Sequence, residues 1–491
     1  MRNYIVYILL CWYNFSFSQT WEWAKNYGYQ YSDYGQSIAV DKDNNIFVKG
    51  NSQNTDLLYK FYSNGQKLWV EALPSFGGVV RTDSIGNCFV FNKNMAPGGK
   101  IAKYDNSGSV LWLKEIPGVT ISDLYTLPSG ELIVSGYNIS GLNVTVGNSI
   151  VSPNYGFVAK TDNDLNFIWV KVQYRYGIVS IAVGPSGKIY TAGNSNGVTQ
   201  DSSSVRVFDS LGNYFGGIIS VNRYLELIAV DKSENIYLAG QQLRTYPLAI
   251  DQYTLQINCT DCDPGYIVKF NSNGEKLWHK IIMQHMTLKS LKLDKTANVY
   301  IAGGISRGLK IDSFFLDNHI SESYVAKFDS NGSLLWAKNS ERLLNPSGDN
   351  SYSGISDMDL DSEGNPIITG AMGWHHKFDN IVLVSNGLSD FLLAKISQDP
   401  VVGTSEMAAP NSNNLIIFPN PNTGKFSISL AGNSLNSISI KNALWQSVFF
   451  KNYKNKSSQI ETFDLSHLSK GIYFIEVNTD HSAEVKKVII E

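Results

Sequence analysis

Short apolar segments alternate with polar turns along most of the chain. One unit of this kind begins near residues 38, 80, 124, 181, 228, 291 and 358, and its first copy runs from Ile38 to Gly50. An apolar strand, a turn rich in Asp, Asn, Ser and Gly, and a β-branched or aromatic strand together predict a β-hairpin. Recurrence of the same hairpin predicts a repeat architecture.

The turn of this hairpin has its own pattern. Five copies open the turn with an aspartate whose side chain can cap backbone amides; they are Asp41, Asp83, Asp231, Asp294 and Asp361. The asparagine near the end of the turn, as in Asn45, is expected to tolerate the left-handed conformation. A glycine closes six copies and Asn92 the remaining one, both being residues that accept a positive φ.

A second hairpin follows each first one, and Ala326 to Trp336 is its clearest copy. Tryptophan occupies the same place near the end of five copies, at Trp69, Trp112, Trp169, Trp278 and Trp336. In a degraded copy Gly216 takes that place, and the last copy stops at Ile396 before any tryptophan. Trp23, at the other end of the chain, lies in a segment that repeats the missing strand.

This split of one unit between the two ends predicts a closed ring, because a ring leaves no exposed sheet edge at its ends. Trp23 is expected to be buried between neighbouring units, as the other tryptophans are. A linear stack of sheets could use the same units, but it would not need the split. The fold class expected is therefore all-β, with a seven-bladed β-propeller of four-stranded blades over residues 19–399, whose last blade is closed by the N-terminal strand.

These units resemble the SBBP-type propeller repeats of secreted bacterial proteins and, more distantly, quinoprotein repeats. The resemblance implies a propeller and an extracellular location. Quinoprotein enzymes pair adjacent cysteines near their cofactor, and this chain has no adjacent pair.

The first residues have the pattern of a signal peptide. Arg2 provides the positive charge, Tyr4 to Trp12 the apolar stretch, and Ser16 and Ser18 the small residues that a signal peptidase reads. Cleavage after Ser18 would remove residues 1–18. The alternative is a buried core strand.

A polar linker at residues 400–412 precedes a small β domain at residues 413–491. Its ordered motifs are similar to those of the type A sorting domain of type IX secretion substrates, which is a small Ig-like sandwich. The resemblance points to Pro419, Asn420, Pro421, Gly424, Asp464, Leu468, Gly471, Tyr473, Lys486 and Lys487. It implies the type IX machinery and its C-terminal signal peptidase as partners. It also implies a secreted or outer-membrane surface location in a Gram-negative bacterium after Sec-type export to the periplasm. An ordinary Ig-like accessory sandwich is the alternative.

Charge and apolar runs exclude two classes of partner. The chain has 40 basic and 43 acidic residues and a net charge of −3, which provides no field for nucleic acid. After residue 20 no apolar run reaches the roughly 18 residues of a transmembrane segment.

Few residues suggest chemistry. Cys259 and Cys262 have metal or redox spacing, but without further cysteine ligands a local disulfide is the better interpretation. Asp41 to Asn45 resembles part of a calcium loop, although it lacks the glycine and the distant glutamate. Trp374, His375 and His376 could form an exposed ligand site or a solvated insertion. No catalytic, cofactor-binding or metal-binding residue is assigned, and calcium is the candidate ion that the sequence leaves open.

Insertions within four repeats, at residues 137–155, 241–265, 304–323 and 371–389, are expected on one rim of the ring. Loops on a rigid scaffold often carry function, so this rim is the expected binding surface for a glycan or a protein. The expected function is a non-catalytic binding or adhesion protein. The alternative is a secreted enzyme that acts on polysaccharide or protein. Carboxylates converging on the central channel would favour the enzyme.

Overall fold

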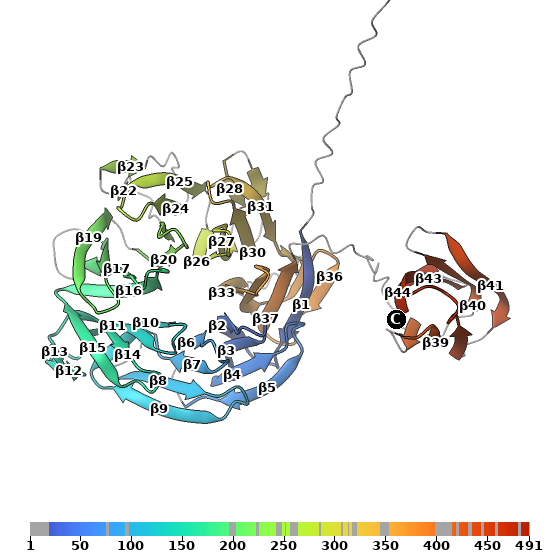
Figure 1. Ribbon diagram of the computed structural model, residues 1–491, viewed down its shortest axis with the longest axis horizontal. Helices are drawn as coiled ribbons and strands as arrows, with labels where there is room; N and C mark the ends of the chain where they lie inside the picture. Colours follow the sequence, from blue (N-terminus) through green and yellow to red (C-terminus); the bar gives the residue numbers. More distant parts are fainter. Residues whose placement is uncertain are drawn as a thin grey trace, which may run out of the picture. The chain divides into compact units, whose positions relative to one another are not determined.

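The computed structural model of the chain describes residues 19–490 with gaps at 75–77, 94–97, 196–202, 222–224, 242–247, 251, 256–263, 284–285, 306–307, 313, 317–321, 344–352, 398–414, 419–421, 431–434, 443–445, 457–459 and 480–482 (Figure 1). Its contacts divide the chain into two units, Met1–Asp399 and Pro400–Glu491. Every regular element in the described part is a strand.

Several predictions from the sequence lie outside the described residues. They concern the signal peptide at 1–18, the linker at 400–412, and the residues Cys259, Cys262, Pro419, Asn420 and Pro421.

Seven sheets in the first unit each contain four strands paired as an antiparallel meander. Sheets 1 to 3 are β2 (Tyr34–Val40), β3 (Ile46–Ser52), β4 (Thr55–Phe61) and β5 (Lys67–Ala72); β6 (Val79–Thr82), β7 (Cys88–Phe91), β8 (Gly99–Tyr104) and β9 (Val110–Ile116); and β10 (Val119–Thr126), β11 (Leu132–Asn138), β14 (Gly156–Thr161) and β15 (Phe167–Gln173). Sheets 4 to 6 are β16 (Tyr176–Val183), β17 (Ile189–Ser195), β18 (Ser203–Phe208) and β19 (Tyr214–Val221); β20 (Leu227–Val230), β21 (Ile236–Gln241), β24 (Gly265–Phe270) and β25 (Lys276–Met283); and β26 (Met286–Leu293), β27 (Val299–Ile305), β30 (Glu322–Phe328) and β31 (Leu334–Asn339). Sheet 7 contains β33 (Gly354–Leu360), β34 (Pro366–Met372), β37 (Asp390–Ser397) and β1 (Thr20–Tyr27).

The sheets stand around a common centre with their first strands innermost (Figure 1). Each first strand contacts the first strand of the next sheet, and β33 of sheet 7 contacts β2 of sheet 1. The outermost strand of sheet 7 is β1, which pairs antiparallel with β37. The two ends of the first unit therefore meet within one sheet.

The aspartate turns confirm the expected capping but not the expected backbone. The amides of Asp43 and Asn45 donate to Asp41 Oδ1 at 2.9 and 2.8 Å. The left-handed residue is the one before the asparagine, with φ of 62° at Asn44 and 60° at Glu234. The expectation for the asparagine was wrong, because its side chain is used to bond the turn aspartate, at 2.9 Å in the first copy.

The closing glycines serve a different purpose from the one expected. Gly136 and Gly303 do not have a positive φ; instead, a Cβ there would lie 2.2 Å from the carbonyl oxygen of Thr120 and 1.8 Å from that of Thr287. Each of these glycines faces a first strand at a bulge, as between Ile121 and Asp123. Close approach of two backbones explains the glycine.

Two of the insertions change the expected strand count. The hairpin β22 (Leu248–Ile250) and β23 (Tyr253–Leu255) pairs with β19 of the preceding sheet, and β28 (Leu309–Ile311) and β29 (Phe314–Leu316) pairs with β25. Sheets 4 and 5 therefore have six strands. These hairpins extend the outer edges of neighbouring sheets, an arrangement that was not expected from the sequence.

The other two insertions also form hairpins. One is β12 (Val144–Val146) with β13 (Ser149–Val151), and the other is β35 (His375–Phe378) with β36 (Ile381–Val384). The second hairpin pairs with β32 (Glu341–Arg342).

The second unit has two sheets around one core. The first is β38 (Leu415–Phe418), β39 (Lys425–Leu430) and β42 (Ile460–Asp464); the second is β41 (Ser447–Lys456), β40 (Leu435–Asn442), β43 (Gly471–Thr479) and β44 (Ala483–Ile490). Alternating apolar residues of both sheets meet in a single buried cluster that includes Phe426, Ile440, Phe463, Ile475 and Val488.

Candidate functional site

The repeated tryptophans hold neighbouring sheets together. Each stands on the last strand of a four-stranded meander, opposite a lysine of the adjacent strand, as in the pair of Trp69 and Lys60. The same pairing recurs at Trp112 with Lys103, Trp169 with Lys160, Trp278 with Lys269, Trp336 with Lys327, and Trp23 with Lys395.

From this position the indole reaches a turn of the next sheet. Trp278 Nε1 donates to the carbonyl of Ser330 at 3.0 Å, and Lys269 Nζ donates to the same oxygen at 2.9 Å. A Cβ on Gly332 would lie 2.8 Å from the Trp278 ring, and one on Gly65 of sheet 1 would lie 2.9 Å from the Trp23 ring. The contact made by Trp23 thus spans the junction between sheets 7 and 1.

Trp23 packs against the core between sheets 7 and 1, as expected, and it is partly buried there like the other repeated tryptophans. Trp21, two residues earlier, is the buried one, with 4% exposure. Its ring meets that of Phe378 edge-on at a centroid distance of 4.9 Å. Sequence comparison of the repeats missed Trp21 because no other repeat has a tryptophan there.

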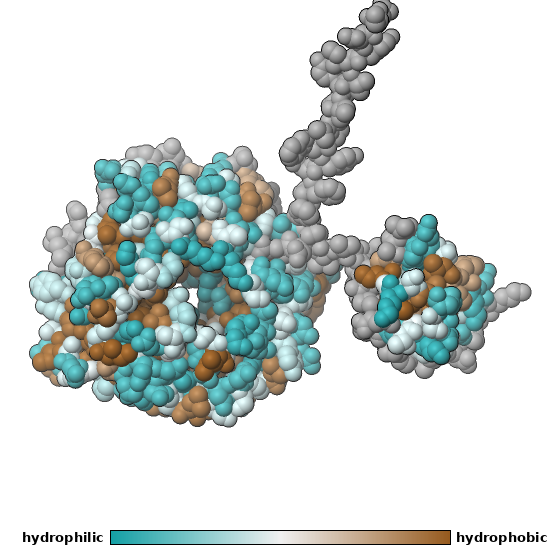
Figure 2. Space-filling model, viewed as in Figure 1, coloured by the Kyte–Doolittle hydropathy of each residue, from teal (hydrophilic) through white to brown (hydrophobic). Residues whose placement is uncertain are grey.

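The innermost strands of all seven sheets surround a central cavity of about 630 Å³. An opening at the centre of this unit is visible in Figure 2. The cavity is lined by both charges and apolar side chains. Its cations are Arg81, Lys93, Lys289 and Lys292, and its carboxylates are Asp123, Asp357 and Asp359.

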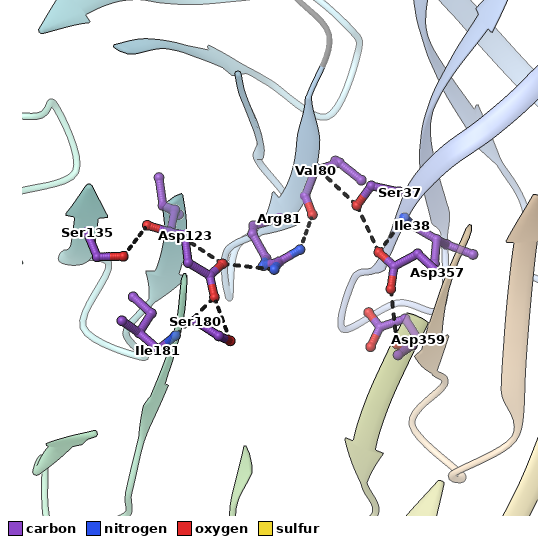
Figure 3. A network of polar contacts seen from close by, with 12 residues as sticks. Ser37, Ile38, Val80, Arg81, Asp123, Ser135, Ser180, Ile181, Asp357 and Asp359 are labelled. Atoms are coloured by element: carbon purple, nitrogen blue, oxygen red, sulfur yellow. Dashed lines mark hydrogen bonds and ion pairs between the residues drawn. The ribbon is translucent and has the colours of Figure 1, made fainter. Parts of the chain in front are cut away.

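Asp357 ties three sheets together at this cavity (Figure 3). Its Oδ2 accepts from Ser37 Oγ at 2.9 Å and from the amide of Ile38 at 3.2 Å, both in sheet 1. Its Oδ1 accepts from Ser290 Oγ of sheet 6 at 3.1 Å and from the amide of Met358 at 2.8 Å.

Asp123 repeats this arrangement on the other side of the ring (Figure 3). Its Oδ2 accepts from Ser180 Oγ at 3.2 Å and from the amide of Ile181 at 3.1 Å, both in sheet 4. Its Oδ1 accepts from Arg81 of sheet 2 at 3.0 Å. Burial lowers the pKa of Arg81, but the negative charges of Asp123, Asp357 and Asp359 have the larger effect, so the pKa of Arg81 is raised.

The third carboxylate is also engaged. Asp359 Oδ2 accepts from the amide of Val40 at 2.8 Å, and its Oδ1 lies 3.0 Å from Lys292 Nζ. Three carboxylates therefore converge on the central channel. From the sequence, such an arrangement was expected to favour an enzyme. Both oxygens of all three, however, already hold amides, hydroxyls or cations. These contacts join the inner strands of neighbouring sheets, which gives the three carboxylates a structural role.

Replacing Asp357 tests this structural role. In Asp357→Ala the Ile38 amide and two serine hydroxyls lose their acceptor, and we expect a loss of about 1–3 kcal/mol in the free energy of unfolding. Asp43→Ala is the control, since that carboxylate is 58% exposed and pairs with the adjacent Lys42. Urea denaturation of both variants measures the difference; equal stability would contradict the role.

The segment Trp374 to His376 is neither an exposed ligand loop nor a solvated insertion. His376 lies in β35 with 1% exposure, and its Nε2 is 2.9 Å from Ser353 Oγ. Burial, together with the charge of Arg342, lowers the pKa of His376 to about 4. This histidine is part of the core.

The carboxylate of Asp41, the calcium candidate, is already bonded by residues of its own turn. Both of its carboxylate oxygens accept hydrogen bonds from the turn residues. Within the described ranges, no group of three or more His, Cys, Asp and Glu side chains has the geometry of a metal site. Cys88 is buried on β7, and burial raises the pKa of its thiol.

In the second unit, three separate motif segments meet at one place. The amide of Leu465 donates to the carbonyl of Gly424 at 2.7 Å, and Asn422 forms a parallel bridge with Ile490. Gly424 has a φ of 90°, and a Cβ there would lie 2.5 Å from the Cα of Ser466. Gly424 is therefore required both by its backbone angle and by this contact.

The remaining motif residues continue from this junction. Tyr473 donates to the carbonyl of Ser469 at 2.7 Å and stands opposite Val488 of the last strand. The amide of Leu468 donates to the carbonyl of Leu465 at 2.9 Å. Gly471 begins β43, and Lys486 and Lys487 lie in β44 opposite that strand.

Asp464 closes the same loop at the surface. Its Oδ1 accepts from Ser466 Oγ at 2.6 Å, and its Oδ2 lies 3.2 Å from Lys425 Nζ. The bond from Ser466, followed by that from Lys425, lowers the pKa of Asp464 to about 2.

The channel carboxylates were missed by the sequence analysis, although a signal for them exists. Ser37, Asp123, Ser180, Ser290 and Asp357 each stand directly before the first apolar residue of a repeat. A column of short polar residues at that place would have marked the positions that bond across the inner strands.

Family comparisons give two matches. Residues 22–57 match the SBBP family, described as a beta-propeller repeat, and residues 416–491 match the secretion system C-terminal sorting domain. The chain thus carries a propeller repeat and a sorting domain. The sorting domain implies export by the type IX secretion system, and so a secreted or cell-surface location.

A curated relative is an uncharacterized WD repeat-containing protein of Acanthamoeba polyphaga mimivirus, 24% identical over 359 residues. The match covers 65% of this chain but only 23% of that relative.

Solved structures with similarity include the Dos1 propeller and the virginiamycin B lyase of Staphylococcus aureus. The first is 10% identical, with a TM-score of 0.44 and coverage of 79% of this chain and 97% of the other. The second is 10% identical, with a TM-score of 0.41 and coverage of 76% and 98%. In the described part of this chain no helix has the length and apolar character needed to cross a membrane.

Proposed function

We propose that this protein is an exported, non-catalytic binding or adhesion protein. Its first unit is a closed seven-bladed propeller that presents the binding site, and its second unit is an Ig-like sorting domain read by the type IX machinery and cleaved by the C-terminal signal peptidase of that system. The propeller then acts outside the cell, released or held at the surface.

The binding role is supported by the contacts of the channel carboxylates and by the size of the central cavity. Asp123, Asp357 and Asp359 use their oxygens to join neighbouring strands, as a scaffold requires. A central cavity of about 630 Å³ has the size of sites for small ligands, which range from about 300 to 1,000 Å³. Binding needs only this preformed shape and its polar groups.

Binding is tested with the purified mature chain on an array of glycans and bacterial surface proteins. We expect selective retention of one ligand class without turnover of the bound ligand. Absence of any ligand would contradict the binding role, and cleavage of an arrayed polysaccharide or protein would support the enzyme instead.

A single glycine tests the sorting role. Gly424→Ala places a Cβ 2.5 Å from Ser466 and strains a φ of 90°, so we expect the junction of the motif segments to open and the secreted fraction to fall severalfold. The control is Ser427→Ala in β39, the strand that follows Gly424, because the hydroxyl of Ser427 bonds the surface hydroxyl of Thr462. Immunoblots of medium, surface and periplasmic fractions measure the distribution; equal secretion of both variants would contradict the role of the junction.

A further inference from the structure

The cations of the central cavity fall into two classes. Arg81 and Lys292 are paired with Asp123 and Asp359. Lys93 and Lys289 also line the cavity, but neither side chain makes a hydrogen bond or an ion pair with another described residue. Lys289 attracts the carboxylate of Glu226, although burial outweighs this attraction and raises the pKa of Glu226. Two cationic groups therefore remain available to a ligand.

The two lysines occupy similar places in two different sheets, Lys289 in sheet 6 and Lys93 beside sheet 2. Lys289 is the extra residue in the bulge of β26 between Leu288, which stands opposite Gly303, and Ser290, and its side chain is exposed. Lys93 follows Asn92, the residue that takes the place of that glycine in sheet 2, and it bridges to Ile121 beside the equivalent bulge of sheet 3. Both positions lie at the end of the inner strands away from the aspartate turns.

The wall of the cavity near sheet 5 has a different character. Its inner strand, β20, has no bulge and contributes Leu227 and Ala229 to the lining. Leu293 and Val183 flank it from sheets 6 and 4. The cavity therefore offers an apolar wall together with unpaired ammonium groups, while Gln36 and Ser356 add polar atoms at its edge.

We propose that the central channel binds an acidic saccharide, with one sugar carboxylate held by Lys93 and another by Lys289, and with a C–H face of a ring against Leu227 and Ala229. This inference rests on the proposed binding function and names its ligand class. A hexuronic acid unit combines one carboxylate, several hydroxyls and apolar C–H faces, which matches this division of the wall. Ammonium-to-carboxylate hydrogen bonds are among the stronger ones in proteins. A cavity of about 630 Å³ admits one or two sugar units.

The test is calorimetric titration of the mature full-length chain with digalacturonic acid, with galactobiose as the neutral counterpart. We expect binding of the acid only, weakening as salt is raised. In Lys93→Ala/Lys289→Ala the affinity should fall by roughly tenfold or more, and Lys289→Arg should retain most of it. Lys67→Ala, an exposed lysine on the outermost strand of sheet 1, is the matched control.

Thermal unfolding of each variant verifies the fold, and the single lysine variants replace the double variant if it unfolds. Equal binding of galactobiose, or unchanged affinity in the lysine variants, would overturn the acidic-saccharide site. The same holds if digalacturonic acid fails to bind. If the array then yields another ligand whose binding ignores the lysine variants, the proposed binding function stands without this site. If the array yields nothing as well, both fail.

Discussion

Removing residues 19–28 is expected to destabilise the whole first unit and not only its terminus. The deletion takes away β1, whose residues pair with β37 from Thr20 to Tyr27. It exposes the edge of β37 and uncovers the junction with sheet 1, whereas loss of a loosely attached terminus normally costs little. Urea denaturation of the mature and shortened chains measures the change. Unchanged stability would show that β1 does not close the ring.

Two point variants sharpen this prediction. Trp21→Ala removes a buried ring that packs on Phe378, and we expect a loss of about 3–5 kcal/mol. Trp23→Ala removes a ring that is only partly buried and should cost less. Glu22→Gln is the control, because its ion pair with Lys395 is 35% exposed on the glutamate side and should contribute under about 1 kcal/mol. A larger loss for Trp23 than for Trp21 would contradict this assignment.

Deleting residues 413–491 is expected to abolish export. The first unit has its own compact set of contacts, so the shortened chain should fold and accumulate in the periplasm. Fractionation of cells carrying the shortened chain measures this, with trypsin resistance of the periplasmic material as the control for folding. Normal release of a folded, shortened chain would refute the sorting role.

The sequence predicts the local hairpins and the partner of Trp23 because both depend on repeated residues. Trp23 stands opposite Lys395, as Trp69 stands opposite Lys60, and this register can be inferred by aligning the copies. Capping by Asp41 is equally local, since donors and acceptor lie within four residues.

Other features could not be inferred because they depend on contacts between distant segments. The hairpin β22–β23 joins the outer strand of the preceding sheet, which nothing in its own residues specifies. Asp357 bonds Ser37 across 320 positions of sequence. The closing glycines were assigned to a positive φ, but Gly303 is needed because the backbone of Thr287 passes so close. In each case the missing information was the identity of the neighbour.

The proposed binding role requires that the protein is exported. A fusion protein tests this export most directly. Residues 413–491 are joined to the C-terminus of a periplasmic reporter enzyme in a bacterium with a type IX secretion system, and reporter activity is measured in medium, on intact cells and in periplasm. We predict activity in the medium or on the cell surface, and its loss when Gly424→Ala is introduced into the fused segment. An intact fusion that stays in the periplasm would contradict the account.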